Sequence, residues 1–217
     1  MRIVALADTH GMHYDVKVPD GDILIHAGDF CNHGVLSEVI EFNNWLRDLP
    51  HKMKVVIAGN HDVCFDKGCT GSSSVAKLLL SEALYLENSG YCGLEDNKEY
   101  FLWGSPMTPT FNDWAFMEDR DKIDRYWSMI PKKTDILVTH GPAYGVLDKV
   151  PLTYMSTHSV GCEGLLEKIN KVKPKIHIFG HIHASYGITK IKDTVFVNCS
   201  ICNEEYDIVN EPVVIDI

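Results

Sequence analysis

Five short apolar runs in the chain are each followed at once by residues able to bind a metal ion. Seven oxygen and imidazole donors share this placement: Asp8, His10, Asp29, Asn60, His140, His181 and His183. Such groups suit divalent transition metals. Seven donors exceed the need of one ion, and with Asp29 bridging they make two sites of four ligands each, plus solvent. Two ions about 3.5–4 Å apart can clamp a phosphoryl group and activate a bridging water for in-line attack.

The runs that precede these donors are expected to be strands. They are rich in β-branched residues, as strands buried on both faces are, and span residues 3–7, 23–25, 55–58, 136–138 and 176–179. Ligands in open α/β sheets bind beyond the carboxyl ends of the strands, so the donors are expected to meet in one crevice. Glycines beside four of the five groups allow the backbone to turn sharply there.

Helical patterns separate the strands. Apolar residues recur at helical spacing over 35–49 and 165–172, and each pattern stops before a proline. A less regular pattern predicts a helix over 119–129, whereas the Gly-Ser-Ser-Ser stretch at 71–74 predicts a loop. Further strands are predicted at 188–191, 195–198 and 213–217. Strands that alternate with helices predict a layered α/β sandwich.

Charge and composition exclude several classes of binding partner and several cellular locations. The formal net charge is −10 and no run of Lys or Arg is present, which argues against binding to long nucleic acid. Since no apolar stretch reaches about 18 residues, we expect no membrane span. Seven dispersed cysteines and an N-terminal apolar run too short for a signal peptide predict a reduced, cytoplasmic protein. The length suits a single domain, 1–217, as a monomer or a homodimer.

The five donor groups resemble the ordered motifs of the calcineurin-like metallophosphoesterase superfamily, which run D-x-H, G-D, G-N-H-[DE], H and G-H-x-H. The matching stretches are Asp8-Thr9-His10, Gly28-Asp29, Asn60-His61-Asp62, His140 and His181-Ile182-His183. Five motifs in order are far more specific than any one of them. Further stretches, such as Asp113–Phe116 and Asn198–Ser200, resemble the metallophosphoesterase-domain-containing branch over essentially the whole chain. Cys31 stands where that branch usually has Thr, which leaves every ligand in place.

This resemblance implies a fold, an assignment of the seven donors to two metal ions, and roles for two further residues. The fold is a layered sandwich of two mixed β-sheets flanked by helices. One metal is implied at Asp8, His10, Asp29 and His183. The other metal is implied at Asp29, Asn60, His140 and His181. His61 is implied as the catalytic acid or charge stabiliser facing the phosphoryl group, with Asp62 orienting it.

Five further residues are candidates for contact with the substrate: His13, His33, Trp114, Phe116 and Tyr144. The two histidines lie just past metal motifs. The three aromatic residues flank glycine and proline turns, where they can stack on a base or simply pack locally. His26 and His177 lie inside strand runs and are expected to be core histidines.

The resemblance implies a dinuclear metal-dependent phosphoesterase acting on small phosphate esters. Small phosphodiesters are favoured, cyclic nucleotides first, because the branch is associated with that chemistry. A phosphomonoesterase, including a protein phosphatase, is the enzymatic alternative. A scaffold that has lost catalysis is a third reading, but such proteins typically lose ligands, and here His61 and every ligand are present. Mixed oxygen and nitrogen sites accept manganese, iron, zinc, cobalt or magnesium, of which we expect manganese.

Overall fold

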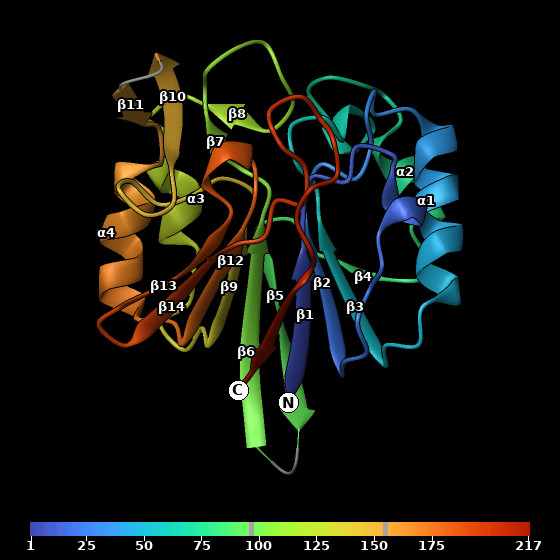
Figure 1. Ribbon diagram of the computed structural model, residues 1–217, viewed down its shortest axis with the longest axis horizontal. Helices are drawn as coiled ribbons and strands as arrows, with labels where there is room; N and C mark the ends of the chain where they lie inside the picture. The colour runs from blue at the N-terminus through green and yellow to red at the C-terminus, as the bar shows by residue number, and fades with distance from the viewer. Residues whose placement is uncertain (96–97, 154–155) are drawn as a thin grey trace.

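Two β-sheets packed face to face form the centre of the protein, with helices on both outer sides (Figure 1). The computed structural model describes residues 1–95, 98–153 and 156–217. The first sheet has five strands, in the order β15 (Val213–Asp216), β1 (Arg2–Leu6), β2 (Ile23–Ala27), β3 (Met53–Ile57) and β4 (Leu84–Tyr85). Only β15 runs antiparallel to its neighbour in this sheet, so the sheet is mixed.

The second sheet has six strands and is also mixed. Its order is β13 (Gly187–Ile191), β14 (Thr194–Asn198), β12 (Ile176–Phe179), β9 (Ile136–Thr139), β6 (Lys98–Ser105) and β5 (Ser89–Glu95). The outer pairs are antiparallel and the inner pairs parallel. The predicted sandwich of two mixed sheets is therefore confirmed.

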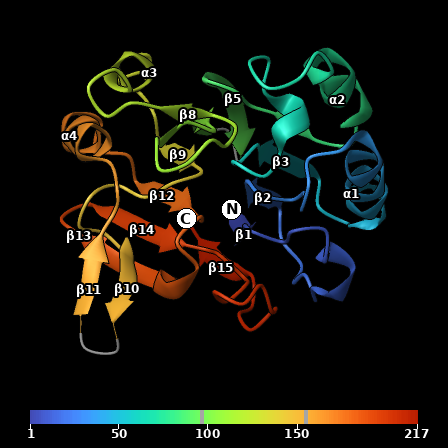
Figure 2. The same ribbon diagram turned by 90° about the horizontal axis from the view of Figure 1, so that it is seen from above.

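The four α-helices of the described residues cover the sandwich, as Figure 2 shows from above. Helices α1 (Leu36–Asp48) and α2 (Ser73–Leu79) lie outside the first sheet, and α3 (Asp124–Ser128) and α4 (Glu163–Val172) lie outside the second. In the described part of the chain, two short strand pairs remain: β7 (Thr108–Pro109) with β8 (Met117–Glu118), and β10 (Lys149–Thr153) with β11 (Ser156–Ser159). The same part contains three short 3-10 helices, η1 (His13–Asp15), η2 (Val63–Phe65) and η3 (His183–Ser185). No helix in the described ranges is long and apolar enough to cross a bilayer.

Alternating side chains of each strand enter two different cores. From β1, Ile3 and Ala5 pack between the sheets, where they meet residues of the facing sheet such as Ile178. Val4 and Leu6 point the other way and pack under helix residues such as Phe42 of α1. The strands are therefore buried on both faces, which is why they read as continuous apolar runs.

Three local predictions need correction. A helix, α2, begins at Ser73, where a loop was expected; Ala76 is buried, and serine is tolerated at the start of a helix. The helix expected over 119–129 is reduced to α3 and is preceded by a turn in which the amides of Lys122 and Ile123 both donate to the Asp119 carbonyl. Strands β5 and β6 were not predicted, since their outer halves form an exposed, partly charged hairpin.

Candidate metal centre

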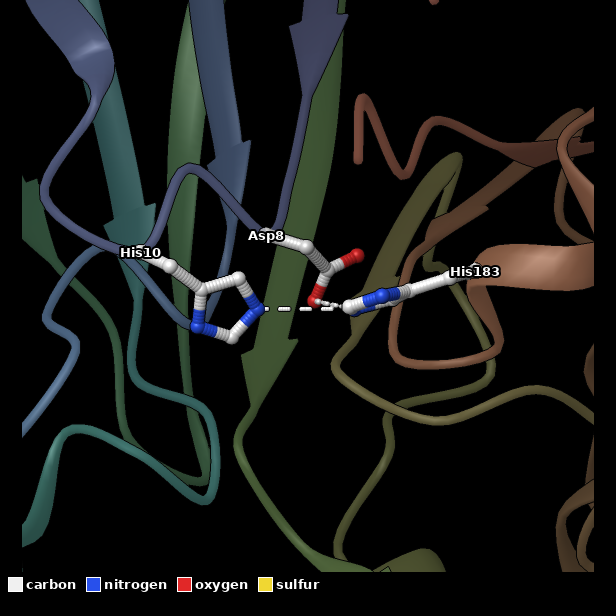
Figure 3. A group of neighbouring side chains, drawn as sticks. All are labelled: Asp8, His10 and His183. Carbon is white, nitrogen blue, oxygen red and sulfur yellow. Dashed lines mark hydrogen bonds and ion pairs between the residues drawn. The ribbon is translucent and has the colours of Figure 1, made fainter. Parts of the chain in front are cut away.

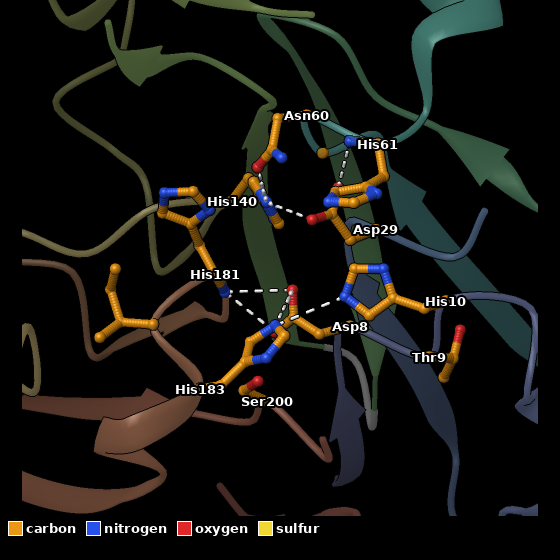
Figure 4. Close-up of polar contacts among 12 residues, drawn as sticks. Asp8, Thr9, His10, Asp29, Asn60, His61, His140, His181, His183 and Ser200 are labelled. Carbon is orange, nitrogen blue, oxygen red and sulfur yellow. Dashed lines mark hydrogen bonds and ion pairs between the residues drawn. The ribbon is translucent and has the colours of Figure 1, made fainter. Parts of the chain in front are cut away.

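The seven predicted ligands all lie at the carboxyl ends of five strands, where the two sheets meet (Figure 4). The first sheet contributes its ligands from the ends of β1, β2 and β3, and the second from the ends of β9 and β12. A parallel bridge between Ala7 and Ser200 joins the sheets at this edge, with the Ala7 amide donating to the Cys199 carbonyl at 2.9 Å. The donors predicted from five separate sequence motifs are thus brought into one place.

Two glycines are needed for this close approach. A Cβ atom on Gly59 would lie 2.3 Å from Asp29 Oδ1, and one on Gly180 would lie 2.4 Å from Asp8 Oδ2. Neither distance is compatible with a side chain. The carboxylates of Asp8 and Asp29 are therefore packed directly against neighbouring backbone, which accounts for their burial.

One group of donors consists of Asp8, His10 and His183, whose ligand atoms lie within 4.8 Å of one another (Figure 3). Nε2 of His10 is 3.4 Å from Nε2 of His183, and the latter is 3.9 Å from Asp8 Oδ1. Two imidazole nitrogens facing each other beside a buried carboxylate form an arrangement that a shared cation stabilises. These three residues belong to the set that the family resemblance implies for the first metal.

A second group consists of Asp29, His140 and His181, again with ligand atoms within 4.8 Å. His140 Nε2 is 3.2 Å from Asp29 Oδ2 and 3.0 Å from the side-chain oxygen of Asn60. These four residues are those implied for the second metal. A third group, His10, Asp29 and His61, overlaps both and places His61 beside Asp29.

Backbone carbonyls fix the tautomers of two ligand imidazoles, those of His140 and His183. Nδ1 of His140 lies 2.9 Å from the Ala27 carbonyl oxygen, and Nδ1 of His183 lies 2.8 Å from that of Asn203. A carbonyl oxygen only accepts, so each Nδ1 carries a proton, and Nε2 is a lone-pair donor whenever the ring is neutral. This is the arrangement that metal-ligating histidines adopt, and the donor set therefore fits divalent ions.

Charges in the centre depend on burial and on Asp29. Burial lowers the pKa of His10 to about 4 and that of His181 to about 3, so both rings are neutral at pH 7. Burial also disfavours a charge on His140, but Asp29 outweighs it and raises the pKa of His140 to about 9. A proton thus joins His140 to Asp29 in the ion-free protein, in the place that a cation would take.

The affinity for a divalent ion is expected to fall about tenfold per pH unit from pH 8.5 to pH 7.5. His140, with a pKa of about 9, must release one proton before its Nε2 can bind an ion, and that proton competes better as the pH falls. His10 and His181 have none to release in this range. Calorimetric titration with manganese in buffers of different ionisation enthalpy measures the protons released. Binding without proton release would show that His140 is already neutral in this pH range, contrary to its raised pKa.

The resemblance implied that Asp62 orients His61, but among the described residues the Asp62 carboxylate forms no hydrogen bond with the His61 ring. This carboxylate accepts three backbone amides, from Gly59 at 2.7 Å, Cys31 at 2.8 Å and Asp29 at 2.9 Å. Burial and the neighbouring Asp29 raise the pKa of Asp62 to about 8, while the amides of Gly59 and Cys31 lower it. Asp62 therefore ties together the two loops that carry Asp29 and Asn60.

His61 is oriented instead by a backbone carbonyl and an aromatic ring. Its Nδ1 donates to the Asn32 carbonyl oxygen at 2.9 Å, which leaves Nε2 free of that contact. The indole of Trp114 stacks on the imidazole with ring centroids 4.4 Å apart. A loop that the sequence places more than 50 residues away thus covers one face of His61.

The centre opens into a cavity of about 600 Å³. Its floor includes His10, Asp29 and His61, and Trp114 is the one predicted substrate-contact residue that lines it. Sequence reasoning missed other lining side chains, namely Phe111, Asn112, Arg120, Glu204 and Tyr206. They lie on loops, and no motif or periodicity distinguishes them in the sequence.

The other four candidates for substrate contact lie outside the cavity lining. His13 is 1% exposed and packs between Phe42 and Trp45, with ring centroids 5.3 Å apart in each case, so it is a core residue. Phe116 is also buried and belongs to the core. His33 and Tyr144 are exposed, and neither lines this cavity. His26 and His177 are fully buried, as expected, and bond to the hydroxyls of Thr9 and Thr139.

Known proteins resemble the chain in both sequence and fold. The profile of the calcineurin-like phosphoesterase family matches residues 1–185. Human metallophosphoesterase domain-containing protein 1 is 39% identical, over 100% of this chain and 71% of its own length. A UPF0046 protein of Caenorhabditis elegans is 36% identical, over 100% of this chain and 81% of its own.

Two solved structures share the fold. A phosphopantetheinyl hydrolase from Mycobacterium tuberculosis superposes with a TM-score of 0.61 at 13% identity, over 94% of this chain and 90% of that one. A purple acid phosphatase from yellow lupin seeds superposes with a TM-score of 0.51 at 16% identity, over 92% and 43% of the two chains. At these identities the likeness concerns the fold alone.

Proposed function

Because this chain belongs to the calcineurin-like phosphoesterase family, in its metallophosphoesterase-domain-containing branch, we propose that it hydrolyses small phosphodiesters, with cyclic nucleotides foremost. Family membership makes it a metal-dependent phosphoesterase. The observation that carries the finer proposal is a complete donor set at the floor of a small cavity with aromatic walls.

Two divalent ions, when bound, supply Lewis acidity that neutralises the charge of the phosphoryl group and activates water. One ion is assigned to Asp8, His10, Asp29 and His183, and the other to Asp29, Asn60, His140 and His181. We expect manganese at both positions. His61 is oriented through Nδ1, and in its imidazolium form, with both ring nitrogens protonated, Nε2 would donate to the phosphoryl group or the leaving oxygen. Asp62 holds the two loops in register without contacting the substrate.

The cavity favours a small substrate over a polymer. Among the described residues that line it, Arg120 is the one Lys or Arg. Its guanidinium is already engaged by the carbonyls of Val160 and Gly161 and by the carboxylate of Glu163. A phosphodiester carries one negative charge and needs little positive charge beyond two cations. Long nucleic acid, in contrast, binds through many phosphate contacts.

Aromatic side chains on the cavity wall support a nucleotide among such diesters. Phe111 is 50% exposed and Trp114 37% exposed, although both are large apolar residues. Exposed aromatic rings next to a phosphate site can stack on a base, which contributes about 1–3 kcal/mol per base. We therefore place the base of a cyclic nucleotide against this wall and its phosphate over the metal centre.

Turnover of diesters is expected to exceed that of monoesters. The test compares kcat/KM for p-nitrophenyl phosphate, bis-p-nitrophenyl phosphate, and 2′,3′- and 3′,5′-cyclic AMP, with manganese and at one pH. A tenfold preference for the monoester, equal to about 1.4 kcal/mol in the transition state, would make the protein a phosphomonoesterase instead. No turnover of any ester by protein that holds two ions would favour the inactive scaffold.

A further inference from the structure

Tyr206 reaches the metal centre from the loop that follows β14, outside every motif of the sequence. Its ring centroid lies 4.7 Å from that of His10, 5.4 Å from that of His183 and 6.0 Å from that of His61, in edge-to-face orientations. The side chain lines the cavity, and the residue is 42% exposed. A phenol therefore borders the centre on its open side.

The backbone of Tyr206 is left-handed, with φ at 67°. A bulky residue rarely adopts this strained conformation, which persists where the surroundings impose it, often at functional sites. Four predicted ligands share it, namely Asp8, His10, Asp29 and His181, with φ values of 58°, 44°, 56° and 70°. Tyr206 thus has the same backbone conformation as residues that form the floor of the site.

Asn203 imposes the position of Tyr206. Its side-chain oxygen accepts the amides of Glu205 at 3.1 Å and Asp207 at 2.8 Å, and its carbonyl accepts the amide of Tyr206 at 3.1 Å. The same carbonyl accepts Nδ1 of His183 at 2.8 Å. One residue therefore couples the orientation of a predicted metal ligand to the placement of the phenol.

The hydroxyl of Tyr206 forms no hydrogen bond with a residue of the described ranges. Some other tyrosines do: the hydroxyl of Tyr85 donates to Glu87 at 3.0 Å, and that of Tyr186 donates to the Glu211 carbonyl at 2.9 Å. A phenol is a good hydrogen-bond donor, and here it lies in a cavity built around anion-binding chemistry. We therefore look for the hydrogen-bond acceptor of the Tyr206 hydroxyl among ligands bound in the cavity.

We propose that Tyr206 is a further catalytic residue, whose hydroxyl donates a hydrogen bond to a non-bridging oxygen of the phosphate group seated at the metal centre. The inference rests on the proposed function for the presence of a phosphate group, but not for the kind of ester. A donor placed there in advance stabilises the charge that develops on the phosphoryl oxygens during the reaction. The contacts with three imidazoles hold the ring in place without consuming the hydroxyl.

The test removes the hydroxyl alone, with Tyr206→Phe in manganese-loaded protein. Calorimetric titration with inorganic phosphate is expected to give a Kd about 5- to 20-fold weaker than wild type, with unchanged metal content. On the best ester substrate kcat is expected to fall about 10- to 100-fold, with a smaller change in KM. Tyr91→Phe, at an exposed tyrosine of β5, is the matched control and keeps wild-type values.

Equal phosphate affinity in wild type and Tyr206→Phe would overturn the proposal. So would a Tyr206→Phe variant with wild-type kcat beside an impaired Tyr206→Ala variant, since the ring would then matter only for packing. Loss of manganese from Tyr206→Phe would also overturn it by making the phenol a support for the ligands. If wild type binds phosphate but hydrolyses no ester, the proposed function fails while the phosphate comparison still tests Tyr206.

Discussion

Replacing Asp29 with asparagine is expected to reduce bound metal from two ions to one or none and kcat/KM by at least about 10³-fold, or about 4 kcal/mol. Asp29 is a carboxylate within reach of both donor groups, 3.2 Å from His140 Nε2 and in one three-residue group with His10. The amide removes the negative charge shared between two cations. It keeps an oxygen for the bond from the His61 amide, which is 2.7 Å long, so the loop should stay folded.

Elemental analysis of purified protein, with circular dichroism to verify folding, measures this effect. Asp48→Asn is the matched control, because Asp48 is an exposed carboxylate at the end of α1 and the substitution changes net charge equally. It should retain both ions. A folded Asp29→Asn variant that still holds two ions tightly would show that Asp29 does not bridge them.

His61→Ala is expected to lower kcat by about 10²–10⁴-fold while both ions remain bound. The ring lines the cavity, its Nδ1 is held by the Asn32 carbonyl, and Trp114 covers one face. Loss of the imidazole therefore removes a positioned donor to the phosphate group. Added imidazole should restore part of the activity, because alanine leaves space beside the cavity.

The metal content of the His61→Ala variant distinguishes a catalytic role for His61 from a role as a metal ligand. The second role must be tested because His61 also belongs to a group that can hold an ion with His10 and Asp29. Parallel loss of metal and activity would make His61 a ligand, and the catalytic role would be wrong. His158→Ala, at an exposed histidine of β11, should change neither quantity.

The carbonyls that orient the imidazoles could not be predicted from the sequence. Any residue has a carbonyl, so nothing in the chain identifies Ala27, Asn32 or Asn203 as partners of His140, His61 and His183. The hydrogen-bond partners of Asp62 could not be predicted for the same reason, because a buried carboxylate beside a histidine accepts from whichever donors the fold places near it. In the structure, backbone amides of two loops donate to the Asp62 carboxylate.

The sequence by itself determined the strands and the donors that end them. Strands buried on both faces must be apolar throughout, so runs such as 3–7 and 176–179 are visible locally, and so are the polar residues where burial stops. The side chains that cover the metal centre, in contrast, could be identified only from the tertiary structure. Trp114 and Tyr206 reach His61 and His10 from distant loops, and His13, next to a metal motif, turns into the core under α1. Loop side chains follow no hydrophobic period, and their positions depend on how two sheets pack, which no local pattern encodes.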